Sequence, residues 1–142
     1  MIRRHPLPAE TGARLQTLGE ALERYPHIVF AYLFGGAATG DLKPLSDVDV
    51  AVYLDDAADL HAGKLEVVGI VTAHLRTDEV DIIVLNEAPT ALAGRVLGSR
   101  RVIVDREPFR RHRFESRALR EFLDFRIVEH RLLSLRFGHQ RG

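Results

Sequence analysis

The stretch that most constrains this fold covers residues 33–54, with the sequence LFGGAATGDLKPLSDVDVAVYL. It contains the end of one apolar segment, a pair of glycines, a polar loop and a second apolar segment. β-Branched and aromatic residues are concentrated in both apolar segments, which is typical of strands, and the glycine pair interrupts the first one. The stretch therefore predicts two strands joined by a glycine turn and a polar loop.

Hydrophobic periodicity predicts the other elements. Strands are expected over 28–34, 47–54, 79–85 and 101–104, helices over 8–24, 57–75, 89–97 and 108–137, and a turn or short helical piece over 37–45. Thr11 is a possible cap for the first helix, and Asp55 and Asp56 for the second. This order predicts an α/β (α+β) fold with a mixed sheet of about four strands flanked by helices.

The whole-chain composition fits one domain. The chain has 142 residues, 46% of them hydrophobic and 28% charged, which is ordinary for a globular protein. We expect a single domain over residues 1–142, with a core over about 9–105 and a long helical extension over about 107–138. The extension carries more apolar residues than one helical stripe needs, which favours a second apolar face for a partner.

Charge and cysteine content exclude several classes of protein. The formal net charge is zero, so no overall excess points to nucleic acid or a membrane, and we expect neither as a partner. The chain has no cysteine, which excludes disulfides, thiolate nucleophiles and Cys-ligated zinc. The N-terminus lacks the apolar run of a signal peptide, so a cytoplasmic location is expected.

Three aspartates are the candidate metal ligands. Asp47 and Asp49 are two residues apart, and on a strand such side chains lie on the same face. Asp81 interrupts an apolar run, where a buried charge without a partner is costly. If the two strands are neighbours, the three carboxylates converge and repel one another unless divalent cations lie among them. Two Mg²⁺ ions held in this way would bind a nucleoside triphosphate for in-line attack on its α-phosphate.

Other nucleotide and hydrolase motifs do not fit. Gly35 and Gly40 have the spacing of a P-loop, but Asp41 and Leu42 stand where that motif needs lysine and serine or threonine. The histidines show no metal-binding spacing. Ser46 and Ser99 have no evident histidine–acid companions, so a hydrolase triad is not supported.

The combination of Gly35-Gly36, Ser46-Asp47-Val48-Asp49 and a third carboxylate at Asp81 resembles the minimal nucleotidyltransferases of the DNA polymerase beta-like superfamily. The resemblance covers about residues 28–85. It implies that Gly35, Gly36 and Ser46 contact the triphosphate and that Asp47 and Asp49 hold the metals. Asp81 would complete the metal site and activate the attacking hydroxyl.

The C-terminal helix narrows the resemblance. Phe114-Glu115, Leu119 and the run from Phe122 to Phe125 are similar to the end of the MNT antitoxins that pair with HEPN toxins. The resemblance implies an adenylyltransferase that moves AMP from ATP, with Mg²⁺, to a tyrosine of a ribonuclease toxin. The sequence departs from the family at Gly36, where a serine is usual, and at Thr39, where an arginine is common.

Two other functions stay open at this stage. One is an antitoxin that neutralises its toxin by binding alone, and the other is a nucleotidyltransferase that modifies a small molecule such as an aminoglycoside. The sequence leaves open the identity of the partner, the target tyrosine, the oligomeric state and the choice of ATP over other triphosphates. It also leaves open how far Gly36 and Thr39 reduce activity.

Overall fold

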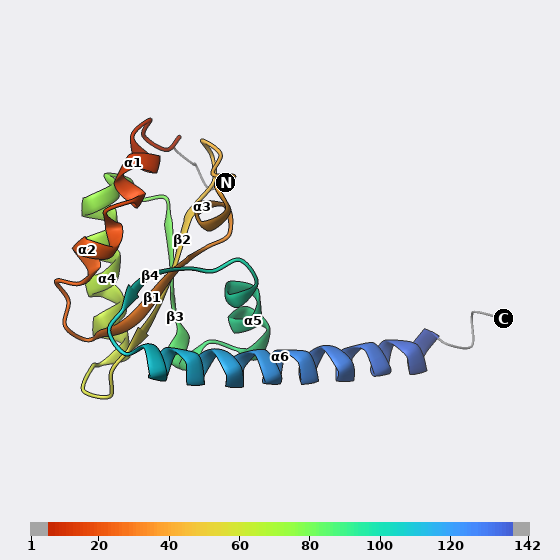
Figure 1. The fold of residues 1–142 in the computed structure, drawn as a ribbon. Helices are drawn as coiled ribbons and strands as arrows, with labels where there is room; N and C mark the ends of the chain where they lie inside the picture. The colour runs from red at the N-terminus through yellow and green to blue at the C-terminus, as the bar shows by residue number, and fades with distance from the viewer. Residues whose placement is uncertain (1–5, 138–142) are drawn as a thin grey trace.

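The computed structural model describes residues 6–137, which form a four-stranded sheet with helices on both faces (Figure 1). The strands are β1 (Ile28–Phe34), β2 (Val48–Leu54), β3 (Val80–Val84) and β4 (Arg101–Asp105), in the order β3-β2-β1-β4. β1 pairs antiparallel with β2 and with β4, whereas β2 pairs parallel with β3. The predicted mixed sheet is confirmed, and each strand lies within one residue of its predicted bounds.

The helices follow the predicted order, except that the first predicted helix is divided in two and a short 3₁₀ turn follows β3. They are α1 (Thr11–Leu15), α2 (Leu18–Leu22), α3 (Gly36–Thr39), α4 (Leu60–Leu75), α5 (Thr90–Gly98) and α6 (Pro108–Phe137), with a short 3₁₀ turn η1 (Leu85–Glu87) after β3. The predicted helical extension ends at residue 138, which lies outside the described residues, as do His5, His139 and Arg141. Within residues 6–137 no helix is both long and apolar enough to cross a bilayer.

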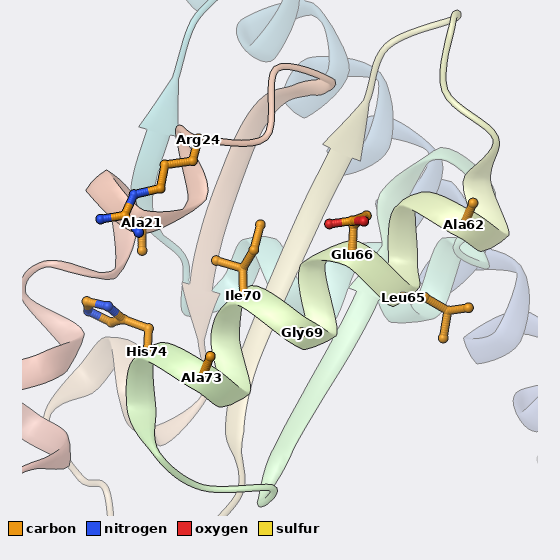
Figure 2. A pocket seen from close by; sticks show the side chains of 9 residues that line it. All are labelled: Ala21, Arg24, Ala62, Leu65, Glu66, Gly69, Ile70, Ala73 and His74. Carbon is orange, nitrogen blue, oxygen red and sulfur yellow. The ribbon is translucent and has the colours of Figure 1, made fainter.

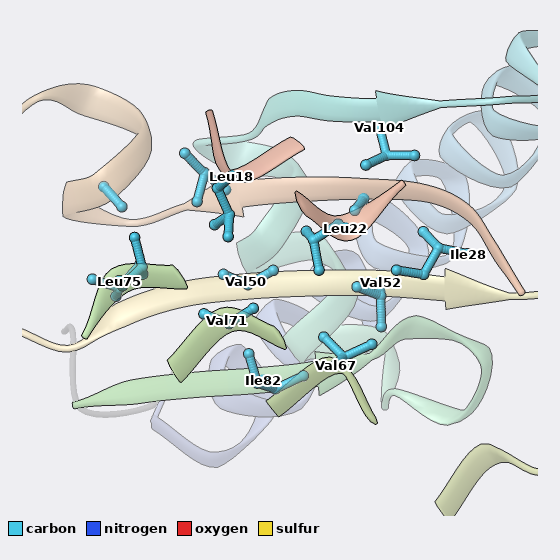
Figure 3. Packing of buried hydrophobic residues seen from close by; sticks show 14 of the residues in the cluster. Leu18, Leu22, Ile28, Val50, Val52, Val67, Val71, Leu75, Ile82 and Val104 are labelled. Atoms are coloured by element: carbon cyan, nitrogen blue, oxygen red, sulfur yellow. The ribbon is translucent and has the colours of Figure 1, made fainter. Parts of the chain in front are cut away.

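One face of the sheet packs against α1, α2 and α4. Figure 3 shows the cluster there, in which Leu18 and Leu22 from α2 and Val67 and Val71 from α4 meet the sheet. The alternate valines of β2, Val48, Val50 and Val52, point into this cluster and are fully buried, as their spacing predicts.

The other face packs against α5 and the first part of α6. Phe30, Tyr32 and Phe34 from β1 form one cluster with Phe114 and Ala118 from α6 and with Val96 and Leu97 from α5. Because both faces are covered, every residue of β1 is buried, which explains its continuous apolar sequence. Ala51 and Tyr53 of β2 also lie on this face, so Asp49, two residues before Ala51, shares it.

The first predicted helix is in fact two short helices. The periodicity of residues 8–24 suits one helix, but a turn at Gln16 and Thr17 separates α1 from α2. Gly19 of α2 lies so close to β4 that a Cβ there would stand 2.3 Å from the Ile103 carbonyl oxygen. This approach to β4 is a tertiary contact, which periodicity does not encode.

The predicted helix caps were wrong. Thr11 lies inside α1, and its hydroxyl donates to the Pro8 carbonyl at 2.7 Å. Asp59, not Asp55 or Asp56, caps α4 by accepting from the Ala62 N–H at 3.0 Å. Asp55 instead accepts from the Ala57 N–H at 3.1 Å, which holds the turn after β2. An aspartate can cap a helix or hold a turn, and the local sequence does not choose between them.

The first half of α6 is anchored to the sheet by a buried carboxylate. Glu115 accepts from the Tyr32 hydroxyl at 2.8 Å and pairs with Arg100 at 3.0 Å and with Arg111 at 3.1 Å. Arg111 also pairs with Asp105 of β4 at 3.0 Å. Beyond this anchor, α6 extends past the rest of the domain (Figure 1). Its distal apolar side chains are exposed: Leu123, Phe125, Ile127, Val128, Leu132, Leu133 and Leu135.

Gly94 sets the distance between α5 and α6, which gives a testable prediction. A Cβ at Gly94 would stand 2.2 Å from the ring of Phe122, so Gly94→Ala forces the two helices apart. We expect this change to destabilise the protein by about 1–3 kcal/mol, the usual cost of overpacking, in denaturant unfolding.

Gly98→Ala is the matched control, because a Cβ there meets nothing within 4 Å and the residue lies in the same helix. Removing the ring in a Gly94→Ala/Phe122→Leu double variant should recover part of the loss. Equal stability of the two single variants would contradict this account of the α5–α6 contact.

Candidate functional site

Asp49 lies in β2, between the neighbouring strands β1 and β3. In the sheet it is opposite Phe34 on β1 and opposite Asp81 on β3. Neighbouring strands are about 4.8 Å apart, and paired residues of parallel strands point to the same face. The register therefore gathers Asp49 and Asp81, as predicted for neighbouring strands. Asp47 directly precedes β2, two residues from Asp49.

The surroundings of Asp49 disfavour its charge. Partial burial, followed by the nearby carboxylates of Asp81 and Asp47, raises the pKa of the Asp49 carboxyl above its usual range. The guanidinium of Arg95 on α5 acts in the opposite direction on this pKa. Asp81 itself is exposed, so the burial cost expected from its apolar neighbours does not arise. Three carboxylates thus influence one another here, and Arg95 offsets only part of the effect of burial and of the other two carboxylates on Asp49.

The donor set suits a hard divalent cation, although its side chains are not closed around one. Carboxylate oxygens are the ligands that Mg²⁺ prefers, and a bound cation would relieve the repulsion at Asp49. Among residues 6–137, no three acidic or histidine side chains are positioned together to hold a metal ion. The phosphate oxygens of a substrate usually supply the remaining ligands of such an ion. The residues therefore fit Mg²⁺ that arrives with a nucleotide.

The glycine turn lies directly beside Asp49. Gly35 has φ 63°, a conformation that side chains disfavour, and a Cβ there would stand 2.6 Å from Asp49 Oδ2. Glycine is thus required at position 35 both by its backbone conformation and by the nearby carboxylate. Gly36 begins α3, and Gly40 ends it with φ 83°. The turn predicted at Gly35-Gly36 and the Asp49 carboxylate of β2 therefore lie side by side.

Ser46 closes the loop that leads to Asp47. Its N–H donates to the Lys43 carbonyl at 3.0 Å, and its hydroxyl accepts from the Lys43 N–H at 3.3 Å. These bonds hold the turn immediately before Asp47. The structure thus places Ser46 beside the carboxylates, with its hydroxyl used in the loop.

Two residues that were not predicted for the site also lie beside it: Arg95 in α5 and Ser99 at the end of that helix. Ser99 accepts from the Gly35 N–H at 2.9 Å, and Arg95 acts electrostatically on Asp49. A hydrolase triad at Ser99 is not supported, because within residues 6–137 this serine has no hydrogen bond to a histidine or an acidic residue. Both residues are distant from the motif in the sequence and reach it only because α5 packs beside β1. No local signal identifies them.

A cavity of about 320 Å³ opens beside Asp81. Arg95 and Leu92 line it from α5, Lys64 from α4, and Glu87 from η1. A larger hollow of about 780 Å³ lies between α2 and α4, lined by Ala21, Arg24, Ala62, Leu65, Glu66, Gly69, Ile70, Ala73 and His74 (Figure 2). Its helices cover the face of the sheet opposite Asp49, and it contains none of the predicted site residues. The smaller cavity adjoins Asp81, whereas Asp47 and Asp49 are not part of its lining.

The raised pKa of Asp49 gives a stability prediction with a definite sign. Between the ordinary pKa of aspartate and the raised value, the folded protein binds more protons than the unfolded chain, so stability falls as pH rises through this window. At pH 7.5 without divalent cations, Asp49→Asn should therefore raise Tm by a few degrees. The difference should shrink toward pH 4, and added Mg²⁺ should raise the Tm of the unsubstituted protein alone.

Asp124→Asn is the control, because it makes the same chemical change at an exposed position of α6. Thermal unfolding by circular dichroism measures all three proteins. A lower Tm for Asp49→Asn at pH 7.5 would mean that the carboxylate is stabilised rather than strained.

Comparison with known proteins agrees with the fold and with the motif. Residues 16–109 match the family described as polymerase beta, nucleotidyltransferase. Among curated proteins, no sequence matches the chain at a significant level.

Solved structures of toxin–antitoxin complexes contain similar chains. A chain from a toxin–antitoxin crystal structure with AMP-PNP has a TM-score of 0.67 and 20% identity over 87% of this chain and 95% of that one. A chain from the MntA–HepT toxin–antitoxin structure has a TM-score of 0.64 and 20% identity over 86% and 95%. A chain from a tri-AMPylated Shewanella oneidensis HEPN toxin in complex with MNT antitoxin has a TM-score of 0.65 and 17% identity over 87% and 96%.

At this level of identity the structures establish the likeness of fold only. The family match spans most of the chain and includes the glycine turn and all three aspartates. The chain therefore belongs to the polymerase beta nucleotidyltransferase family.

Proposed function

We propose that this nucleotidyltransferase is an antitoxin that transfers AMP from ATP to a tyrosine of a HEPN ribonuclease toxin. The observation that carries the proposal is the set of aspartates beside the glycine turn, with the charge of Asp49 left for a cation to compensate. The names of the similar structures support the choice of partner, since they describe MNT antitoxins with HEPN toxins, AMP-PNP and AMPylation. Residues 1–142 would act as one nucleotidyltransferase domain.

The three carboxylates divide two tasks in the proposed reaction, metal binding and proton acceptance. Asp47 and Asp49 would hold two Mg²⁺ ions, which would neutralise charge on the triphosphate. Asp81, exposed beside a cavity, would accept the proton of the tyrosine hydroxyl. The phenol oxygen then bonds to the α-phosphorus, the bond from that phosphorus to the β-phosphate bridging oxygen breaks, and pyrophosphate leaves.

The distal part of α6 supplies a surface for a helical partner. Phe125, Val128, Leu132 and Leu135 are three and four residues apart, so they share one helix face, and their side chains are 42%, 54%, 60% and 76% exposed. This face continues the one that buries Phe114 and Ala118 against the sheet. Exposed apolar residues in such a row are typical of a protein interface.

A HEPN toxin suits this face better than a second copy of the chain. If two identical α6 helices paired in parallel along this row, Asp124 of one would lie beside Glu129 of the other. Like charges at these positions disfavour that pairing. A toxin of the helical HEPN class can present an apolar helix with the opposite charges.

A binding-only antitoxin is the second candidate. The exposed face of α6 favours it, because this surface could cover a toxin without any chemistry. The Gly35 N–H is also engaged by Ser99 rather than open to phosphate. The two functions differ in whether label is transferred from ATP.

The first test of the proposal is transfer of AMP. The protein is incubated with Mg²⁺, ATP labelled on the α-phosphate, and a purified HEPN toxin as the partner. We expect label on a tyrosine of that partner and a fall of about 100-fold or more with Asp47→Asn or Asp49→Asn, since a lost cation ligand costs several kcal/mol.

Asp78→Asn, an exposed aspartate before β3, is the control and should keep full transfer. Complete neutralisation of the toxin by Asp49→Asn without any transfer of label would support the binding-only antitoxin instead.

The second test concerns the face of α6. Leu132→Glu places a charge in the exposed row and should weaken binding to the same partner by at least about tenfold, because it is costly to bury. His130→Glu introduces the same side chain at an exposed position on the opposite side of the helix and serves as the control. Isothermal titration measures both, and AMP-PNP binding should be unchanged in each. Equal effects of the two changes would show that this row is not the interface.

A further inference from the structure

The hydroxyl of Ser99 is hydrogen-bonded to the glycine turn of the candidate site. Ser99 ends α5, and its hydroxyl accepts from the Gly35 N–H at 2.9 Å. The other side of Gly35 faces Asp49, since a Cβ would stand 2.6 Å from Asp49 Oδ2. Gly35 is therefore contacted by the serine hydroxyl through its N–H and lies against the carboxylate through its Cα. Ser99 and Asp49 therefore both adjoin Gly35, one at its N–H and the other at its Cα.

The bond to Gly35 determines which further hydrogen bonds the Ser99 hydroxyl can form. A hydroxyl has one proton to donate and can accept two hydrogen bonds. Since Ser99 accepts from Gly35, its own proton remains available, and nothing in residues 6–137 accepts it. Ser99 is only half-buried, so part of the residue remains exposed beside the glycine turn. A donor in this place suits an anionic oxygen, whose hydrogen bonds are about twice as strong as neutral ones.

Ser99 is also held firmly. Its N–H donates to the Val96 carbonyl at 3.3 Å, at the end of α5. The next residue, Arg100, donates to the Leu97 carbonyl at 2.8 Å and pairs with the buried Glu115 at 3.0 Å. A hydroxyl fixed on both sides costs little further entropy when it binds a ligand.

We propose that Ser99 is a phosphate-binding residue of this site, donating its hydroxyl proton to the triphosphate of the nucleotide. Gly36, at the start of α3, has no side chain to offer such a donor, and the Gly35 N–H is already engaged by Ser99. The proposal rests on the proposed function, because it requires a nucleotide at Asp47 and Asp49. It assigns the triphosphate contact to a residue distant from the glycine turn in sequence.

The experiment measures the binding of AMP-PNP with Mg²⁺ to the full chain by isothermal titration. Ser99→Ala should weaken binding by about 10-fold to 100-fold, as expected for loss of a hydrogen bond to a charged group. Ser99→Thr retains the hydroxyl and should bind nearly as well as the unsubstituted protein. Ser116→Ala removes an exposed serine of α6 and is the matched control.

A double variant separates phosphate binding from a role in holding the turn. A Cβ at Gly36 would stand 3.3 Å from the Asp41 carbonyl oxygen, so a small side chain fits after a shift of a few tenths of an ångström. Gly36→Ser in the Ser99→Ala background should restore most of the affinity by supplying a hydroxyl from the neighbouring position. Inorganic triphosphate, titrated in the same way, should follow the same order of variants.

The possible results are distinguishable. Affinity unchanged in Ser99→Ala, or lost without recovery in the double variant, would overturn the proposal, since Ser99 would then be dispensable or would only hold Gly35. If Ser99→Ala does not fold, Ser99→Cys replaces it, because a thiol keeps the size but donates weakly. By contrast, absent binding to the unsubstituted protein, or binding that survives Asp49→Asn, would contradict the proposed function itself.

Discussion

The unbalanced charge of Asp49 is the constraint on which the site depends. Its strand is covered on one face by the cluster under α4, while its other face brings the carboxylate between Gly35 and Asp81. Burial and two neighbouring carboxylates act together to raise its pKa, and the guanidinium of Arg95 opposes them. A protein selected for stability alone gains nothing from this arrangement. It becomes favourable once a cation and an anionic substrate enter, which is why the strain points to function.

Glu115 is a second acidic group, and unlike Asp49 its charge is compensated by its neighbours. Glu115 is more deeply buried than Asp49, yet Tyr32, Arg100 and Arg111 compensate it with hydrogen bonds and ion pairs. Burial and the bond to Glu115 raise the pKa of the Tyr32 phenol, so that its proton stays in place. A charge compensated on several sides is structural, and here it fixes α6 to the sheet. The contrast separates the anchoring carboxylate from the proposed reactive ones.

α5 connects the two ends of the molecule. On one side it carries Arg95 and ends at Ser99, beside the glycine turn. On the other side Gly94 admits the ring of Phe122, so α6 packs closely against α5. Arg100, the residue after Ser99, then pairs with Glu115 of α6. The proposed nucleotide site and the base of the proposed partner helix thus share one short segment of the chain, and a displacement of α6 has a direct physical route to Ser99.

The sequence alone determined the strands, the glycine turn and the candidate carboxylates. These features are local: a run such as IVFAYLF has one stable environment between two layers, and two aspartates at alternate positions must share a face of a strand. The tertiary structure decided what lies beside them. It placed β3 next to β2 in a register that pairs Asp81 with Asp49, divided the first helix before α2 packs against β4, and chose Asp59 as the cap of α4. It also brought Ser99 to Gly35 across a separation of 64 residues, because packing of α5 on the sheet, and no local pattern, sets that distance.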